Sequence, residues 1–253
     1  MKQWAFLLSG LVLTVILSSL GAIVLAQPSS SLELHPTSVA ADHHHSSGRE
    51  QDGGHWEGSA QGVAYSEFNH RCVGFLVLLF GLAELGHALR YQLPAWNRLV
   101  LPGAFSVIGI YLLVWSDHEA WPIGSLTFVQ TFSGQDPEIL QHKFYGIFFA
   151  AAAVSETFRR IGWGRHPAWA APLVVGAMIG GFLLFWHSHG NHPANQTTEL
   201  HHALLGSLGL GAAVSSAMIA WGSGPSHRSV KPWEAAWAGL VILIGVQLLL
   251  YFE

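Results

Sequence analysis

The sequence predicts an all-α membrane protein with six transmembrane helices after an N-terminal signal segment, built from repeated helical hairpins. Three observations support this fold class. Of the 253 residues, 51% are hydrophobic and only 10% are charged, whereas soluble domains carry about 25% charged residues. Apolar runs of roughly membrane-spanning length recur along the chain. Short histidine-containing motifs also recur at matching places in successive runs.

The first element is an export segment at residues 1–26. It has Lys2, a long apolar core, and Val24 and Ala26 ahead of Gln27. This pattern is typical of a cleavable signal peptide, although the core is long enough to remain as an uncleaved anchor. In either case, we expect the segment that follows to be exported.

Residues 27–64 are expected to form a flexible, His-rich exported tail. The segment is rich in Ser, Gly, His and acidic residues and poor in large apolar ones, so it has little with which to build a core. Its histidines either bind a divalent metal loosely or remain solvated. The candidates for this auxiliary metal capture are His43, His44, His45 and His55.

Residues 65–253 are expected to form the six-helix transmembrane domain. The apolar runs are residues 75–90 (preceded by a more polar stretch, 68–74), 99–115, 144–158, 168–186, 203–221 and 235–252. Lys and Arg concentrate in the loops after the first, third and fifth runs, which is typical of cytoplasmic loops. These basic residues are Arg90, Arg98, Arg159, Arg160, Arg165, Arg228 and Lys231. The expected topology places both mature termini on the outer side.

Successive runs repeat a short pattern. NHRCVGFLVLLFGLAE at the first run matches QHKFYGIFFAAAAVSE at the third: each has a His, then a basic residue, then Gly four residues and Glu fourteen residues after the His. The fifth begins with HHALLG, while VWSDH ends the second and FWHSH ends the fourth. We infer repeated hairpins, with a last helix that lacks the motif and ends LLLYFE. Such repeats often enclose a site at their interface.

Histidines gather at the outer ends of the expected spans. The outer set is His70, His118, His142, His187, His189, His192, His201 and His202, against His87, His166 and His227 on the other side. A single interfacial His is usually just an amphipathic residue of the headgroup zone. Eight at one face predict that imidazoles from separate helices share a metal ion, with Asp117 or Glu119 as an oxygen donor. Imidazole suits copper, zinc, nickel and iron, so the residue type alone does not name the metal.

Position in the repeat selects the metal ligands. Residues two apart on a helix point about 200° away from each other, so His187 and His189 face one centre only if the helix has ended. The candidate metal ligands are His70, His118, His142, His189 and His202, with His187 and Asp117 as further candidates.

Haem b is the alternative occupant, because transmembrane cytochromes hold haem between imidazoles of neighbouring helices. His142 and His202 would be the axial pair. Only His87 is well placed in a cytoplasmic half-span, which disfavours two stacked haems and leaves a single outer haem as the alternative.

Glu84 and Glu156 lie inside the expected spans, where an acid is costly and commonly functional. Each lies fourteen residues, about 21 Å of helix, beyond the His of its repeat. They either relay protons or ions inward, or they snorkel to the inner interface or pair with Arg90, Arg159 or Arg160.

Several classes of function are not indicated. The sequence has no Gly-rich phosphate loop, nucleophile elbow or basic nucleic-acid face. The single cysteine, Cys72, excludes an intramolecular disulfide and any multi-thiolate site. We therefore expect no nucleic-acid partner and favour a non-enzymatic role, with no catalytic residues assigned.

The segments SEFNHR, WSDHEAWPIG, DPEILQHK and HSHG resemble those of polytopic bacterial membrane proteins of the copper-resistance D (CopD-like) family, over about residues 65 to 221. The resemblance implies copper handling at the periplasmic face of a bacterial inner membrane, with a periplasmic copper-carrying protein or a membrane complex as partner besides the bilayer. Met178 and Met218 are the only methionines after the initiator. This departure favours binding, buffering or delivery of copper through His over transmembrane copper(I) transport.

The sequence thus leads to one main hypothesis and two alternatives. The main one is an inner-membrane copper-binding protein with a periplasmic histidine layer. The alternatives are a single-haem b-type electron-transfer protein and an accessory subunit of a membrane oxidoreductase complex.

Overall fold

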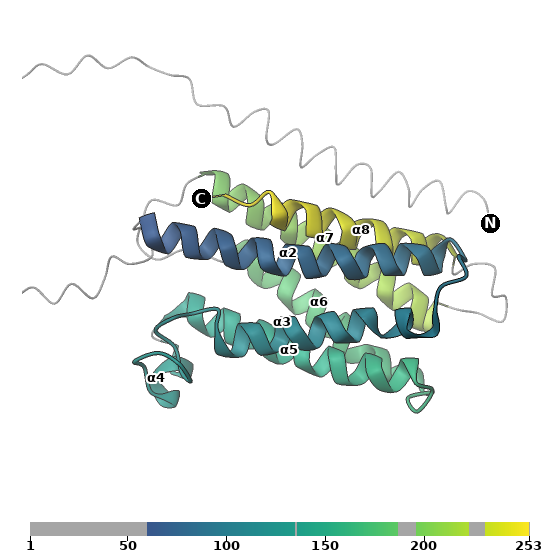
Figure 1. Ribbon diagram of the computed structural model, residues 1–253, viewed down its shortest axis with the longest axis horizontal. Helices are drawn as coiled ribbons and strands as arrows, with labels where there is room; N and C mark the ends of the chain where they lie inside the picture. The colour runs from purple at the N-terminus through teal and green to yellow at the C-terminus, as the bar shows by residue number, and fades with distance from the viewer. Residues whose placement is uncertain (1–59, 135, 187–195, 223–230, 253) are drawn as a thin grey trace, which may run out of the picture.

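The computed structural model describes residues 60–134, 136–186, 196–222 and 231–252, and every regular element in these ranges is helical. The export segment and most of the tail lie outside the described residues. The long helices are α2 (Ala60–Ala88), α3 (Val100–Val114), α5 (Pro137–Arg160), α6 (Ala171–Leu183), α7 (Gln196–Trp221) and α8 (Lys231–Leu249). The short elements are α4 (Phe128–Phe132) and the 3₁₀ helices η1 (Ala95–Leu99), η2 (Pro167–Ala170) and η3 (Leu184–Trp186). The long helices lie side by side (Figure 1).

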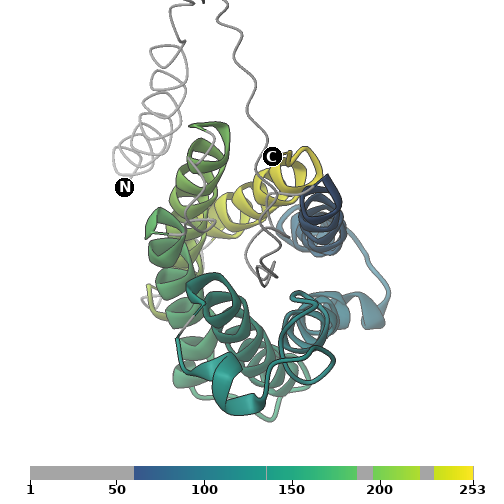
Figure 2. The same ribbon diagram turned by 90° about the vertical axis from the view of Figure 1, so that its left-hand side faces the viewer.

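The six long helices form a ring (Figure 2). Chain order pairs them as α2–α3, α5–α6 and α7–α8, as the sequence repeat predicts. The ring is completed by contacts between hairpins: α3 packs on α5, α6 on α7, and α8 on α2. The α2–α8 contact is the most extensive in the bundle, whereas α2 and α3 touch much less. Each hairpin is therefore held chiefly by its neighbours.

The glycine of each repeat lies where one hairpin meets the next. A Cβ on Gly74 of α2 would lie 2.8 Å from the Leu248 Cβ of α8. On Gly146 of α5 it would lie 3.1 Å from the Gly109 carbonyl oxygen of α3, and on Gly206 of α7 2.7 Å from the Gly181 carbonyl oxygen of α6. The repeated glycine thus permits close helix approach at all three junctions between hairpins.

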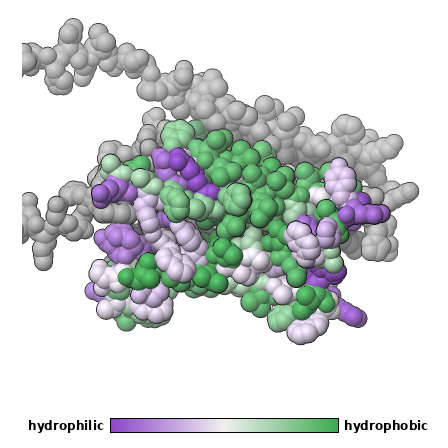
Figure 3. Space-filling view, viewed as in Figure 1, coloured by the Kyte–Doolittle hydropathy of each residue, from purple (hydrophilic) through white to green (hydrophobic). Residues whose placement is uncertain are grey.

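Within the described part of the chain, five helical segments are long and apolar enough to cross a membrane: Ala60–Ala88, Ala95–Val114, Pro167–Trp186, Thr198–Trp221 and Pro232–Leu249. The sequence leads us to expect six. The helix not included is α5, whose two ends carry several charged residues, among them Glu138, Lys143 and Arg160. Figure 3 shows a hydrophobic belt across the middle of the bundle with hydrophilic side chains gathered towards both ends. These features are those of a multi-pass membrane protein in a lipid bilayer.

The first helix begins earlier than the sequence predicts. Residues 60–64, assigned to the exported tail, form the first turns of α2. The start of this helix is tied to the end of α3, because the Tyr65 hydroxyl donates to the Trp115 carbonyl and the Asn69 amide donates to the Ser116 carbonyl at 3.1 Å. Apolar periodicity alone did not reveal this polar extension.

Candidate functional site

A cavity of about 640 Å³ lies inside the ring, lined by residues of all six long helices. Its walls are mainly apolar, with a chain of aromatic rings that includes Phe80, Phe105 and Phe149. One end is polar, and we call it the mouth. The mouth residues are Tyr65, Ser66, Asn69, His70, Tyr111, Ser116, Asp117, His118, Glu119, Asp136, Glu138, His142 and His202.

The mouth is built where α3 ends and α5 begins. Lys143, only 1% exposed, donates to the Leu112 and Leu113 carbonyls at 3.2 Å each and so places a cation at the C-terminal end of α3. Asp136 caps α5 by accepting from the Glu138 and Ile139 amides. The Asp136 cap thus fixes where α5 begins, and Lys143 joins this helix to the end of α3.

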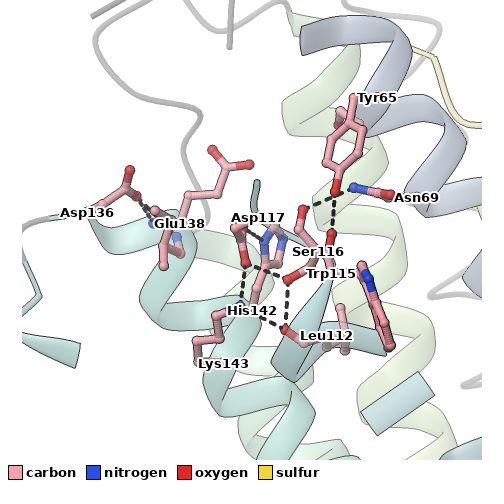
Figure 4. A network of polar contacts seen from close by, with 12 residues as sticks. Tyr65, Asn69, Leu112, Trp115, Ser116, Asp117, Asp136, Glu138, His142 and Lys143 are labelled. Atoms are coloured by element: carbon pink, nitrogen blue, oxygen red, sulfur yellow. Dashed lines mark hydrogen bonds and ion pairs between the residues drawn. The ribbon is translucent and has the colours of Figure 1, made fainter. Parts of the chain in front are cut away.

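Asp117, just beyond α3, accepts two hydrogen bonds and forms one ion pair at this junction (Figure 4). The His142 Nδ1 donates to its Oδ1 at 2.7 Å, the Lys143 Nζ lies 3.2 Å from its Oδ2, and the Ser116 hydroxyl also donates to Oδ2. Burial would raise the pKa of Asp117, but His142, with Ser116 and Lys143, holds that pKa below its ordinary value. Asp117 is therefore an anion that fixes the His142 ring.

His70 is oriented in a similar way. Its Nδ1 lies 2.9 Å from the Ser66 carbonyl oxygen, which can only accept. In a neutral imidazole that donates through Nδ1, the lone pair is on Nε2, the nitrogen available to a metal. His70 on α2 and His142 on α5 thus share one tautomer, and both line the cavity.

Tyr251, which follows α8, lies among three of the histidines. It is fully buried and stacks on His70, with ring centroids 3.9 Å apart. The His201 ring lies edge-on to it with ring centroids 5.5 Å apart, and the His202 ring is tilted by 31° with its centroid 6.2 Å away. His202 is only 2% exposed and lines the cavity. The last helix, which lacks the His motif, thus contributes a tyrosine to the same layer.

A second hydrogen-bonded group joins α2 to α3 at the mouth (Figure 4). Besides its bond to Ser116, Asn69 accepts from the Tyr111 hydroxyl. Asn69 precedes the first repeat histidine, so this group holds the His70 end of α2 against α3.

The structure brings together part of the predicted set. His70, His118, His142, His202 and Asp117 all line the cavity. His118 is the most exposed of them, with 40% of its side chain accessible, and its Nε2 lies 3.7 Å from a Glu119 carboxylate oxygen. His187, His189 and the tail residues His43, His44, His45 and His55 lie outside the described residues. In the described ranges, no three His, Cys, Asp or Glu side chains are placed to hold one metal ion.

Glu84 and Glu156 lie at the opposite end of the bundle, paired with arginines. The Arg160 Nη1 lies 2.8 Å from Glu84 Oε1 and its Nε 3.2 Å from Glu156 Oε2, while Arg159 also pairs with Glu156. Arg90 instead pairs with Glu234 at 2.8 Å. The two acids thus adopt the paired arrangement that was the alternative to a relay.

Three residues were not singled out from the sequence: Asn69, which lines the mouth, and Lys143 and Tyr251, which contact mouth residues. Lys143 follows a repeat histidine and Asn69 precedes one, so the repeat could have indicated both. Tyr251 had only its position at the end of the last helix as a signal. None of the three belongs to a residue class that by itself indicates a metal site.

Comparison of the chain with protein-family models, with curated proteins and with solved structures gave no significant match.

Proposed function

We propose that this protein binds copper at the periplasmic mouth of its central cavity and holds or delivers it there. One observation carries the proposal: His70, His142 and His202 come from three different hairpins, yet all line the same end of one cavity. Asp117 and Glu138 add carboxylates to this end. Histidines distributed by chance would not all line one end of the same cavity.

The chemistry of these side chains suits copper(II), which binds imidazole nitrogen and carboxylate oxygen well. His70 and His142 donate through Nδ1 to oxygen, which is the arrangement of histidines that bind metal through Nε2. Asp117 would then orient His142 instead of binding the ion itself. Because no three candidate ligands of the described residues are placed around one point, the proposed set would be completed by His189, or by His187, from the segment after α6.

The proposed topology has six spans with both termini in the periplasm. α5 is 24 residues long and packs between α3 and α6. Its middle exposes apolar side chains, with Ile147 44% and Val154 56% exposed, as expected of a surface in contact with lipid. The arginine-rich end of the bundle would face the cytoplasm of a bacterial inner membrane. The His-rich tail would collect copper for the mouth, and a periplasmic copper carrier would be the partner.

Electron paramagnetic resonance of the protein loaded with one equivalent of copper(II) tests this proposal. We expect nitrogen hyperfine structure from imidazole, altered or lost in His70→Ala, His142→Ala and His202→Ala. His166→Ala is the matched control, because His166 is exposed at the opposite end of the bundle. Identical spectra for all four variants and the parent protein would contradict the proposal.

Haem b is a second candidate because the cavity has the volume of a ligand pocket and is mostly apolar. His142 on α5 and His202 on α7 would be the axial ligands, and the cavity walls would exclude water. Bound haem would supply one-electron chemistry. A Soret band in the purified protein, lost in either variant, would favour this candidate over copper.

A further inference from the structure

The central cavity is larger than a metal site requires. Its volume of about 640 Å³ falls within the range of roughly 300–1,000 Å³ typical of pockets for organic ligands. A bound ion at the mouth would leave most of that volume unused. The interior must therefore be explained separately.

The interior is suited to an apolar group with aromatic character. Phe105 lies between Phe80 and Phe149, with ring centroids 5.1 Å apart in both edge-to-face pairs. Trp237 and Leu173 extend this lining to α8 and α6. Rings in this arrangement present both faces and edges, which favour contact with other rings and with delocalised cations.

The mouth is negatively charged. Four carboxylates line the cavity, those of Asp117, Glu119, Asp136 and Glu138, whereas no Lys or Arg of the described segments does. Lys143, which pairs with Asp117, offsets one of the four and leaves three. Figure 4 shows Asp136 and Glu138 at the start of the helix that carries His142, near the His142–Asp117 pair. An anionic ligand would be repelled here, and a cationic one attracted.

We propose that the cavity is a binding site for a lipophilic organic cation, whose apolar rings or chain fill the aromatic interior and whose positive charge lies towards the acidic mouth. This inference does not rest on copper, because it uses the volume, the aromatic walls and the sign of the charge. Tyr65 and Tyr145 also line the cavity and would contribute cation–π contacts to the same ligand.

The test measures binding of tetraphenylphosphonium to the metal-free protein in lipid nanodiscs by equilibrium dialysis. Tetraphenylborate has nearly the same size and shape with the opposite charge, and triphenylphosphine oxide is a neutral relative. We expect saturable, one-to-one binding of tetraphenylphosphonium above that of empty nanodiscs, weaker binding of the neutral compound and none of tetraphenylborate. Equal binding of the cation and the anion would overturn the proposal.

Two substitutions locate the site. Gly209 lines the cavity, and a Cβ there would meet only the Gly181 Cα, at 3.5 Å. The backbone at Gly209 thus has room for a Cβ, and the rest of a leucine side chain would occupy the cavity, so binding of the cation should be lost in Gly209→Leu, with the folded state checked by thermal unfolding. The matched control is Gly239→Leu, at a helical glycine of α8 whose Cβ would have nothing within 4 Å and which does not line the cavity. If both variants bind like the parent protein, the cation is not in this cavity and the proposal fails.

Glu138→Gln tests the role of the mouth charge, and we expect it to weaken binding about threefold. An unchanged affinity in this variant would overturn the assignment of the positive charge to the mouth. Because these measurements use metal-free protein, their failure would leave the copper proposal intact. Added copper should lower the apparent affinity for the cation if both positive charges occupy the mouth.

Discussion

The imidazole of His142 and the carboxylate of Asp117 are joined by a 2.7 Å hydrogen bond at the junction of α3 and α5. Because Asp117 also accepts a hydrogen bond from Ser116 and forms an ion pair with Lys143, the ring of His142 is held in one orientation. This relationship connects the packing of two helices to the chemistry of the mouth.

The Asp117→Asn substitution tests that connection. Asn keeps the shape of the side chain but removes the charge that holds His142 in its tautomer, so we expect copper(II) affinity to fall by about 10- to 100-fold. Competition titration against a chelator of known affinity measures the change. Glu234→Gln is the control, since Glu234 pairs with Arg90 and does not line the cavity; an equal loss in both variants would contradict the orienting role of Asp117.

Asp117 also predicts a dependence of stability on pH. Its pKa is lower in the folded protein than its ordinary value of 3.8, so its ionised form stabilises the fold. That contribution is fully present above pH 3.8 and is lost as the pH falls through the lower folded pKa. Thermal unfolding of detergent-solubilised protein from neutral to acidic pH should show this loss, and Asp117→Asn should show a flatter profile. Parallel profiles for the two proteins would contradict the assignment.

Because α6 and α7 approach closely at Gly206, we predict that this position does not tolerate a larger side chain. In Gly206→Val, the Cβ would lie 2.7 Å from the Gly181 carbonyl oxygen, so the helices must separate, at a cost of about 1–3 kcal/mol. Gly239→Val should change stability by no more than about 0.5 kcal/mol, because its Cβ would point into open space. Unfolding in mixed micelles compares the two variants, and a larger effect at Gly239 would refute the packing argument.

Arg160 is predicted to contribute more to the stability of the fold than an exposed arginine does. Arg160→Met would remove the ion pair of Glu84, whose side chain is 13% exposed, and one of the two ion pairs of Glu156. It should destabilise the protein by about 3–5 kcal/mol because it leaves the Glu84 charge largely buried without this partner. Arg71→Met breaks an ion pair with Glu67 in which the Arg71 side chain is 50% exposed, which should cost no more than about 1 kcal/mol. The midpoints of thermal unfolding should differ accordingly; equal midpoints would show that the Arg160 cluster does not stabilise the fold.

The apolar runs and the repeated short motifs predicted the helices and their pairing into hairpins, because both are local properties of the chain. They also placed His70, His142 and His202 at one end of the bundle, since the repeat sets their position relative to each helix. They did not predict the order of hairpins around the ring, which depends on contacts between distant segments. Tyr251 was missed for the same reason: its place among three histidines follows from the packing of α8 against α2.

The helix boundaries and the partners of the charged side chains were harder to predict than the positions of the helices in the sequence. Residues 60–64 continue α2 because Tyr65 and Asn69 find partners on α3, a tertiary effect that hydropathy does not register. Glu84 and Glu156 could be read as a relay or as ion-pair partners until the position of Arg160 between them was known. The copper-ligand set stays a prediction, since His187 and His189 lie outside the described residues.

The most direct test of the central claim is metal analysis together with an absorption spectrum on one detergent-purified, untagged sample. His70→Ala, His142→Ala and His202→Ala are measured alongside it. We predict copper in stoichiometric amount, lost or reduced in the three variants, with no Soret band. Protein that takes up no copper, or that keeps it fully in all three variants, would contradict the claim; a Soret band lost in the His142 and His202 variants would replace copper with haem.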